Sequence, residues 1–392
     1  MVGNKGKGAG HGTRGQRLLV SGAFLIVAVL IGLHLLDRFR PWHLWEGFKR
    51  SYVTDAGRVV DHLQESRSTS EGQAYAMFFA LVANDRRTFD MLLAWTEAEL
   101  SDGDLVSNLP AWLWGHQGNG KWGVQDRNSA TDADLWMAYS LIEAGRLWQH
   151  EAYRQLGRQL AKLTFDRNRV MLEEQGPMLL PAPHGFQLSE GLWRFNPSYL
   201  PPFLLAALQD EMPELGAGDV QKAAETLLRQ AIRNGLVPDW YACCQAGEVI
   251  ADPVTGMTGG YEAIRVYLWL SLSTRSNLNH GALFSKIQGM AEIINAVDAV
   301  PERIDIKTRR IEGTAPAGFV AAMLPYLGIS GNDMLLSRLE KRVEASWRSH
   351  TVGERAHYYD AALGLFSLGW LHGQYSFDAN GRLLTRWSGY GV

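Results

Sequence analysis

Three carboxylates, Glu71, Asp132 and Glu262, stand near the beginning of stretches that are apolar on most sides. A helix of that kind belongs inside a large domain, where an ionised carboxylate is costly unless it is paired, hydrogen-bonded or open to a wet cavity. An acid held in such a place is a candidate catalytic group or an anchor for a polar ligand. These three acids are therefore the first candidates for a functional site.

Two acids in these stretches also have a structural alternative. Ser68-x-x-Glu71 and Thr131-x-x-Asp134 both match the capping box, in which the acid holds the backbone at a helix start. Glu71 is thus open to either a structural or a catalytic role. Asp134 is expected to cap its helix, which leaves Asp132 to face a cleft.

Glu262 follows Tyr261 and precedes Arg265 by three residues. A local ion pair with Arg265 is the structural alternative, and it is worth only a few tenths of a kcal/mol when exposed. Because the helix is otherwise apolar, the pair is expected to be partly buried. An acid beside Arg265 and Tyr261 is then a candidate catalytic group or sugar anchor.

Aromatic residues exceed what a core needs, with 14 Trp, 13 Tyr and 14 Phe, and this excess is compatible with a cleft that stacks on sugar rings. Four tryptophans in loop-like stretches are either sugar platforms or lid packing: Trp112, Trp114, Trp122 and Trp193. A helical tryptophan such as Trp269 is expected to pack in the core.

Beyond Pro41 the apolar spacing is helical almost throughout, and strand signals are few. Helices are expected near residues 42–52, 71–84, 86–100, 131–149, 151–164, 197–209, 219–234, 259–273, 282–297, 316–328, 332–348 and 356–372. Helices that are apolar on most faces alternate with amphipathic, charged ones. This alternation predicts an all-α fold in which an inner ring is wrapped by an outer ring, a double-layered helical barrel.

Most of the inner helices begin with a polar or aromatic cluster. The clusters are Ser70-Glu71, Thr131-Asp132, Asn196 with Ser198-Tyr199, Tyr261-Glu262 and His357 to Asp360. If the inner helices run parallel, these clusters meet at one end of the barrel, where helix dipoles favour ionised carboxylates. A concave, acidic mouth lined by aromatic residues is the default active-site hypothesis.

The N-terminal region predicts a membrane anchor. Residues 1–17 are basic and rich in glycine, so they are expected to be a disordered tail. Residues 18–36, LLVSGAFLIVAVLIGLHLL, are long enough to cross a bilayer of about 30 Å. The positive charge before this segment predicts a cytoplasmic tail and an exported body, residues 42–392. No small-residue cleavage site follows, which favours an uncleaved anchor over a signal peptide; cleavage would instead release a soluble exported protein.

The net charge argues against one class of partner, whereas the cysteine usage does not decide the class of protein. Without the four basic residues of the tail, 34 Lys and Arg face 41 Asp and Glu, so the body carries a net charge near −7, which argues against a nucleic-acid partner. Cys243 and Cys244 are adjacent and are expected to be two small, semi-buried residues without a disulfide. No zinc-type ligand spacing is present, and no cofactor or metal is expected.

The stretch ATDADLWMAYSLIEAGRLW from Ala130 resembles the signature of glycoside hydrolase family 8, with its A-[ST]-D-[AG]-D opening. The resemblance extends from about Trp45 to Trp387 through WEGFKRSYV, TSEGQAYAMFFALVAND, LPAWLWG, WRFNPSYLPP and YEAIRVY. It is greatest to exported endoglucanases made alongside bacterial cellulose synthase. Several motifs in the right order make it specific.

This resemblance implies an (α/α)6 barrel and a hydrolysis that inverts the anomeric centre, with a protonated carboxyl and a carboxylate on opposite faces of the glycosidic bond. By motif position, Glu71 is similar to the general acid, and Tyr261 and Arg265 are similar to residues that hold the water and the base. Asp132 matches an aspartate that is either base or sugar ligand. Glu262 stands where family cellulases commonly have Asp, one methylene shorter, so the base is either Glu262 or Asp132.

The resulting expectation is an endo-β-1,4-glucanase anchored in the inner membrane, facing the periplasm and trimming cellulose during its synthesis and export. Its substrate-binding residues would be Tyr199, Tyr261, Arg265 and the four loop tryptophans named above. Its partners would be a β-glucan chain, the membrane and the cellulose synthase or export complex. Two alternatives remain at this point: a family member acting on chitosan, xylan or mixed-linkage glucan, and a glucan-binding export factor that has lost hydrolysis.

Overall fold

The computed structural model describes residues 1, 3, 41–118, 120–273, 278–350 and 358–389. The chain divides into two units, Met1–Trp42 and His43–Val392. The predicted tail, 1–17, and the predicted membrane segment, 18–36, lie outside the described residues. Within the described ranges, no helix is both long enough and apolar enough to span a membrane.

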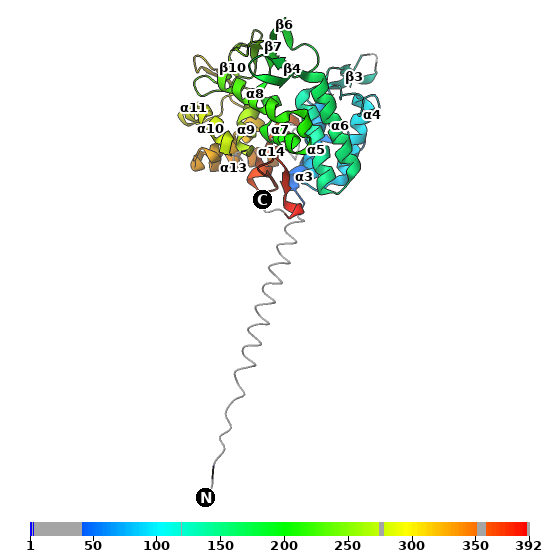
Figure 1. The fold of residues 1–392 in the computed structure, drawn as a ribbon. Helices are drawn as coiled ribbons and strands as arrows, with labels where there is room; N and C mark the ends of the chain where they lie inside the picture. The colour runs from blue at the N-terminus through cyan, green and yellow to red at the C-terminus, as the bar shows by residue number, and fades with distance from the viewer. Residues whose placement is uncertain (2, 4–40, 119, 274–277, 351–357, 390–392) are drawn as a thin grey trace. The chain divides into compact units, whose positions relative to one another are not determined.

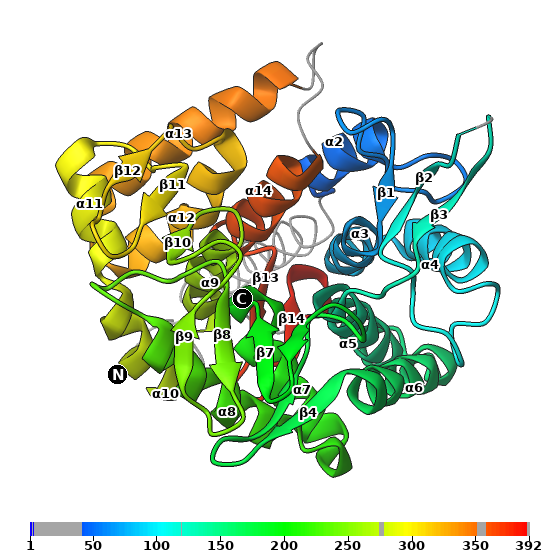
Figure 2. The same ribbon diagram turned by 90° about the horizontal axis from the view of Figure 1, so that it is seen from above.

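The second unit is a double ring of helices, as the sequence predicts (Figure 1). The inner helices are α3 (Ser70–Val82), α5 (Thr131–Leu147), α7 (Pro202–Glu211), α9 (Ala263–Ser273), α12 (Ala317–Ile329) and α14 (Tyr358–Leu371). Each contacts the next, and α14 contacts α3, so the ring closes. Seen from above, these six surround the centre (Figure 2).

The outer helices wrap this ring. They are α2 (His43–Tyr52), α4 (Arg86–Leu100), α6 (Glu151–Asn168), α8 (Ala217–Ala231), α10 (Leu278–Phe284), α11 (Gly289–Val297) and α13 (Asp333–His350). Inner helices such as α3 and α5 are buried on nearly every side, whereas α8 buries only one face. The difference in apolar pattern along the sequence therefore places each helix in its layer.

The centre of the barrel is filled by aromatic rings from different inner helices. Phe366 of α14 lies 4.6 Å from the ring of Phe79, 4.9 Å from Trp136 and 5.0 Å from Trp269. Trp269 is buried in this cluster, which confirms its predicted packing role. Such edge-to-face and tilted contacts stabilise aromatic pairs by about 0.5–1.5 kcal/mol each beyond area burial. The barrel is therefore a packed core, and ligand access is confined to its ends.

Two predicted helices are interrupted. The segment predicted at 282–297 is two helices, α10 and α11, joined by the 3-10 turn Ser285–Ile287. The segment predicted at 197–209 begins with the 3-10 turn Pro197–Tyr199, and α7 starts only at Pro202. Proline cannot donate a backbone hydrogen bond inside a helix, but it is well placed in the first turn of one. This explains why α7 begins at Pro202.

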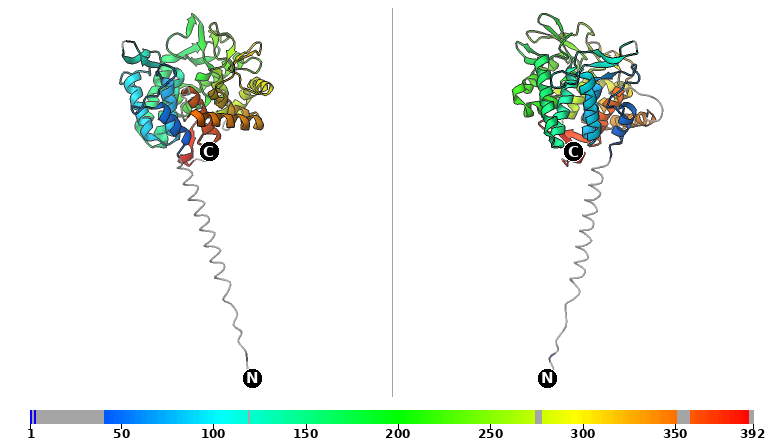
Figure 3. Two further views of the ribbon diagram at one scale, coloured as in Figure 1. Left: turned by 180° about the vertical axis from the view of Figure 1, so that it is seen from behind. Right: turned by 90° about the vertical axis from the view of Figure 1, so that its right-hand side faces the viewer.

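Short antiparallel strands, which the sequence did not predict, build the loops. They are β1 (Ser68–Thr69), β2 (Leu113–His116), β3 (Trp122–Asp126), β4 (Arg169–Leu172), β5 (Gly176–Leu179), β6 (Gln187–Ser189), β7 (Leu192–Phe195), β8 (Tyr241–Cys244), β9 (Val249–Ala251), β10 (Thr258–Gly259), β11 (Arg303–Asp305), β12 (Ile311–Glu312), β13 (Tyr375–Phe377) and β14 (Leu383–Thr385). They pair in the orders β1-β2-β3, β4-β5, β6-β7-β8-β9, β10-β11-β12 and β13-β14. Strands β3, β4, β6, β7 and β10, which belong to different sheets, lie toward the same end of the helices (Figures 1 and 3).

Cys243 lies in β8 and is buried, Cys244 is partly exposed, and both thiols are free. This confirms the interpretation of two small residues without a disulfide.

Candidate active site

Arg265 in α9 joins the three carboxylates that the sequence singles out. Its Nη1 lies 3.1 Å from Oε1 of Glu71, 3.1 Å from Oδ2 of Asp132 and 3.1 Å from the hydroxyl of Tyr75. Its Nη2 donates to Oε2 of Glu262, which is the predicted i, i+3 ion pair in a partly buried setting. The first turns of α3, α5 and α9 therefore meet at one end of the barrel, as expected for parallel inner helices.

Glu71 points into this site instead of capping its own helix. The N-cap of α3 is Thr69, whose hydroxyl accepts the N–H of Gly72 at 3.2 Å, so the capping role considered for Glu71 is wrong. The second carboxylate oxygen of Glu71 accepts a hydrogen bond from Nε1 of Trp112 at 3.3 Å. Trp112 is held nearby because its carbonyl accepts the N–H of Ser70, next to Glu71.

The expected cap of α5 is also absent. The N-cap is Ala130, which offers no side chain, and Thr131 is already helical, with its hydroxyl donating to the carbonyl of Leu180 at 2.6 Å. The prediction that Asp134 caps the helix is wrong because the S/T-x-x-D pattern is offset by one residue from the true helix start. Asp134 is instead fully buried, and neither carboxylate oxygen has a hydrogen-bond donor among the described residues. The Ser129 hydroxyl lies alongside without a bond of ordinary geometry.

Asp132 is enclosed within the site. Its side chain is only 1% exposed, and its Oδ1 accepts the N–H of Ala133 at 2.9 Å. Burial raises the pKa of Asp132 well above its ordinary value, and the negative charge of Glu71 raises it further, while Arg265 acts in the opposite direction. Asp132 is therefore an acid for which ionisation is costly.

Glu262 is fixed through both its backbone and its side chain. Oδ1 of Asp239 accepts the N–H groups of Gly260 at 2.8 Å, Glu262 at 3.0 Å and Ala263 at 2.7 Å. Nδ2 of Asn196 donates to Oε2 of Glu262 at 2.9 Å. Burial raises the pKa of Asp239, and these backbone N–H groups oppose that rise.

Three tyrosines enclose the charged centre. The guanidinium of Arg265 lies 5.5 Å from the ring centroid of Tyr199 and 5.9 Å from that of Tyr359, within cation–π range. Tyr261 is half exposed, stacks on Tyr359 at 6.3 Å and meets Phe319 of α12 edge-on at 4.6 Å. The structure thus brings predicted Tyr199, Tyr261 and Arg265 to the same place as the three acids.

A cleft of about 360 Å³ opens above Arg265. It is lined by Asp61, Gln64, Arg67, Glu71, Tyr261, Glu262, Arg265, Tyr358, Tyr359 and Asp360. The side chain of Glu71 is 18% exposed and that of Glu262 is 27% exposed, whereas Asp132 does not line the cleft. Of the three acids that the sequence singles out, Glu71 and Glu262 therefore line the cleft, and Asp132 is buried beside Arg265.

The profile of Glycosyl hydrolases family 8 matches residues 37–373. The chain belongs to this family. It is 39% identical over 376 residues to an endoglucanase of Xanthomonas axonopodis pv. citri (strain 306), covering 95% of this chain and 97% of that protein. It is 36% identical to an endoglucanase of Escherichia coli (strain K12), covering 93% and 96%. The crystal structure of an endo-1,4-D-glucanase from Vibrio fischeri ES114 matches with a TM-score of 0.84 at 38% identity, covering 88% of this chain and 99% of that one.

In this family 8 glycoside hydrolase, the four loop tryptophans differ in their contacts and in their exposure. Trp112 contacts Glu71 directly, as described above. Trp114 is buried against Trp95, donates to Glu99 and stacks on the exposed Trp122 at 5.4 Å. The guanidinium of Arg58 lies 4.4 Å from the Trp114 ring and 5.1 Å from the Trp122 ring.

The fourth tryptophan, Trp193, lies in a strand of the β6-β7-β8-β9 sheet. It is buried in β7 and pairs with Cys243 of β8. Its role in substrate binding stays a prediction.

Several residues of the site carry no local signal in the sequence. Tyr75 and Asp239 contact the catalytic candidates only because the fold brings distant segments together. Asp61, Gln64 and Arg67 line the cleft from a loop of turns and bridges before α3. Tyr358, Tyr359 and Asp360 belong to a polar cluster that the sequence does place at the start of an inner helix, although without a role for each residue.

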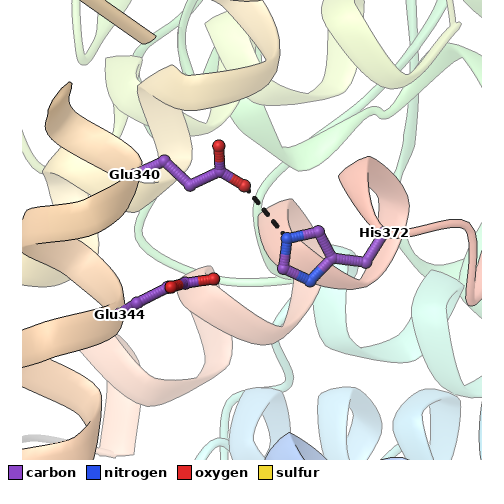
Figure 4. Close-up of side chains that lie close together, drawn as sticks. All are labelled: Glu340, Glu344 and His372. Carbon is purple, nitrogen blue, oxygen red and sulfur yellow. Dashed lines mark hydrogen bonds and ion pairs between the residues drawn. The ribbon is translucent and has the colours of Figure 1, made fainter. Parts of the chain in front are cut away.

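One further group of His, Cys, Asp or Glu side chains in the described residues has ligand atoms close together. It consists of Glu340 and Glu344 of α13 and His372, which follows α14 (Figure 4). Nε2 of His372 lies 3.0 Å from Oε1 of Glu340, and this contact accounts for their closeness. The cluster stands at the opposite end of α14 from Tyr358 and Tyr359, so it is separate from the cleft.

Proposed function

We propose that this chain is an endo-β-1,4-glucanase that hydrolyses internal bonds of cellulose with inversion of the anomeric centre. The observation that carries the proposal is the pair Glu71 and Glu262, two carboxylates open to one cleft and bound to one guanidinium. An inverting hydrolase needs one acid and one base on opposite faces of the scissile bond. The named activity of the relatives at 36–39% identity supports the choice of β-1,4-glucan.

In this mechanism, a protonated Glu71 donates its proton to the leaving glycosidic oxygen. Glu262 takes a proton from a water molecule, which attacks the anomeric carbon from the opposite face. The carbon–oxygen bond breaks as the new one forms, and the products are a chain end with inverted configuration and a free hydroxyl. Afterwards Glu71 is ionised and Glu262 is protonated, and exchange with solvent restores both.

We assign the base to Glu262 because a base must have room for the water beside it. Asp132 has no exposed surface to offer such a water, since it is 1% exposed and lies behind Arg265. Its buried carboxylate beside Arg265 suits it to set the charge around Glu71. Arg265 keeps the acids in place and compensates their negative charge.

The test uses purified full-length protein with carboxymethyl cellulose, mixed-linkage β-glucan, xylan and chitosan. We expect carboxymethyl cellulose to lose viscosity faster than reducing ends appear, as in internal cleavage. Proton NMR of the first products should show the α-anomer, because a β-bond is cleaved with inversion. Absence of sugar release from carboxymethyl cellulose would overturn the substrate, and a β-anomer would overturn the mechanism.

We also propose that residues 18–36 anchor the enzyme in the inner membrane, with residues 1–17 in the cytoplasm and residues 42–392 in the periplasm. The uncharged segment and the positive charge before it support this arrangement. There the enzyme would trim cellulose as the synthase and export complex delivers it. Cell fractionation tests the anchor: recovery of the enzyme in the soluble periplasmic fraction would show a cleaved signal, and recovery in the cytoplasm would overturn the proposal.

A further inference from the structure

Glu262 carries its carboxylate at the end of a flexible side chain, so the site must hold that side chain in one position. A displacement of about 1 Å at a reacting group costs on the order of 100-fold in rate. The neighbours of Glu262 show how its carboxylate is held. Oε2 accepts from both Nη2 of Arg265 and Nδ2 of Asn196. Among the described residues no donor lies within hydrogen-bond distance of Oε1, so this oxygen is left to meet a water in the cleft.

We propose that Asn196 is a positioning residue that holds the carboxylate of Glu262 in the orientation needed to activate the water. This inference rests on the proposed function, in which Glu262 activates the water. By holding Oε2 together with Arg265, Asn196 fixes the direction in which Oε1 points. An oxygen that accepts two hydrogen bonds, one of them from a guanidinium, is a poor proton acceptor, so the proton is taken by Oε1.

The orientation of the Asn196 amide is determined by its other partners. Its Oδ1 accepts the N–H of Ser198 at 2.9 Å and contacts the Ser198 hydroxyl at 2.7 Å. A backbone N–H can only donate, so the atom facing Ser198 is the carbonyl oxygen and the NH₂ group faces Glu262. Asn196 is also the N-cap of the 3-10 turn Pro197–Tyr199, and it is buried. The donor to Glu262 is therefore held by the fold and is ready before substrate binds.

The backbone of Glu262 is held as firmly as its carboxylate. The three N–H groups that Asp239 accepts fix the turn entering α9. With the main chain and Oε2 both fixed, little freedom remains for the rest of the Glu262 side chain. Asn196 lies 66 residues away in the sequence, on a different inner segment, so the two constraints are independent.

Two substitutions separate positioning from folding. Asn196→Asp keeps an oxygen that accepts from Ser198, so the cap survives, but it replaces the donor with a negative charge. Asn196→Ser keeps a hydroxyl that can cap the turn but is too short to reach Glu262. Thermal unfolding by circular dichroism shows whether each variant folds.

We expect both variants to lower kcat by roughly 10- to 100-fold, the effect of one hydrogen bond to a charged group, with KM changed by less than about twofold. In Asn196→Asp the acidic limb of the kcat/KM profile should also move to higher pH, because a second negative charge favours the protonated form of the base.

In a Glu262→Asp background the shorter carboxylate withdraws from Asn196. The further loss caused by Asn196→Ser should then fall below about threefold.

Unchanged kcat and an unchanged acidic limb in both folded variants would overturn the assignment. An equal loss from Asn196→Ser in the wild-type and Glu262→Asp backgrounds would also overturn it, since that result indicates a merely structural role. The wild-type protein is assayed first on the polymer panel given above. If wild type releases no sugar from any polymer, the proposed function fails; if wild type is active and the variants match it, only the role of Asn196 fails.

Discussion

Nη1 of Arg265 lies 3.1 Å from Oδ2 of Asp132, and both side chains are almost completely buried. The same nitrogen lies 3.1 Å from Oε1 of Glu71, so oxygens of Asp132 and Glu71 are within about 6 Å of each other. One positive charge thus stabilises a buried acid and a cleft-facing acid together. Asp132 and Glu262 therefore differ in exposure, and the proposed assignment of the base to Glu262 rests on that difference.

Asp132→Asn and Glu262→Gln are expected to differ in their pH–rate profiles. Glu262→Gln should lower kcat by about 100- to 10,000-fold and remove the acidic limb of kcat/KM, because the base can no longer be titrated. Asp132→Asn should also weaken activity but keep the acidic limb. Steady-state rates between pH 3 and 9 measure both. The opposite pattern, with the limb lost in Asp132→Asn and kept in Glu262→Gln, would transfer the base to Asp132.

The double ring could be predicted from the sequence because apolarity differs so much between its two layers. Buried residues run continuously from Thr131 to Gly145 in α5, whereas α8 shows the one-sided pattern of an outer helix. Long periodic segments carry this signal over several turns. Strands of two to five residues, such as Ser68–Thr69, are too short to show a period and are defined by pairing with distant partners.

The acids of the site were also visible in the sequence, but their contacts were not. Arg265 meets Glu71 across 194 residues and Asp132 across 133, distances over which no spacing rule applies. The capping predictions failed for a local reason. Thr69 caps α3 and α5 starts at Thr131, so in both cases the S/T-x-x-acid pattern is one residue out of register with the helix.

Glu71→Gln is expected to remove hydrolysis and preserve glucan binding. The loss of a general acid should lower kcat by about 100- to 10,000-fold, while the amide keeps nearly the same shape. Reducing-sugar release and affinity electrophoresis in a soluble glucan measure the two properties. Glu214→Gln, at an exposed position on the outer surface, is the matched control and should behave as wild type. If wild type and Glu71→Gln were equally inactive and both bound glucan, the chain would be a binding factor.

Trp122→Ala is expected to raise KM for long glucans by roughly 2- to 10-fold with little change in kcat. The Trp122 ring is 45% exposed and stacks on Trp114, and Arg58, which contacts both rings, also donates to Ser68 just before α3. This places an open aromatic face on β3, in the same three-stranded sheet as β1, the strand that leads to Glu71. Kinetics with oligosaccharides of increasing length measure the effect, which should disappear for the shortest ones.

The control for Trp122→Ala is Trp148→Phe, which alters a tryptophan at the end of α5 whose indole bonds to Asn84. It should leave KM unchanged. An unchanged KM for long chains in Trp122→Ala would assign Trp122 to packing of the β2–β3 hairpin.

Asp134→Asn is expected to stabilise the fold increasingly as pH rises. Burial raises the pKa of Asp134 well above its ordinary value of 3.8, and its oxygens lack donors in the described structure. For an acid whose pKa is raised by folding, the stability it contributes is present below the unfolded-state pKa and is lost as pH rises through the folded-state pKa. The loss is about 1.4 kcal/mol for every pH unit that separates these two pKa values. In Asp134→Asn the neutral amide does not ionise in this pH range, so the variant does not suffer this loss of stability.

The difference in Tm between Asp134→Asn and wild type should therefore be small at pH 4 and should grow toward pH 8 in calorimetric scans. Asp55→Asn, at an exposed position, controls for the change of side chain and should show no such growth. A difference that is constant or shrinks with pH would mean that Asp134 is ionised and stabilised by its surroundings.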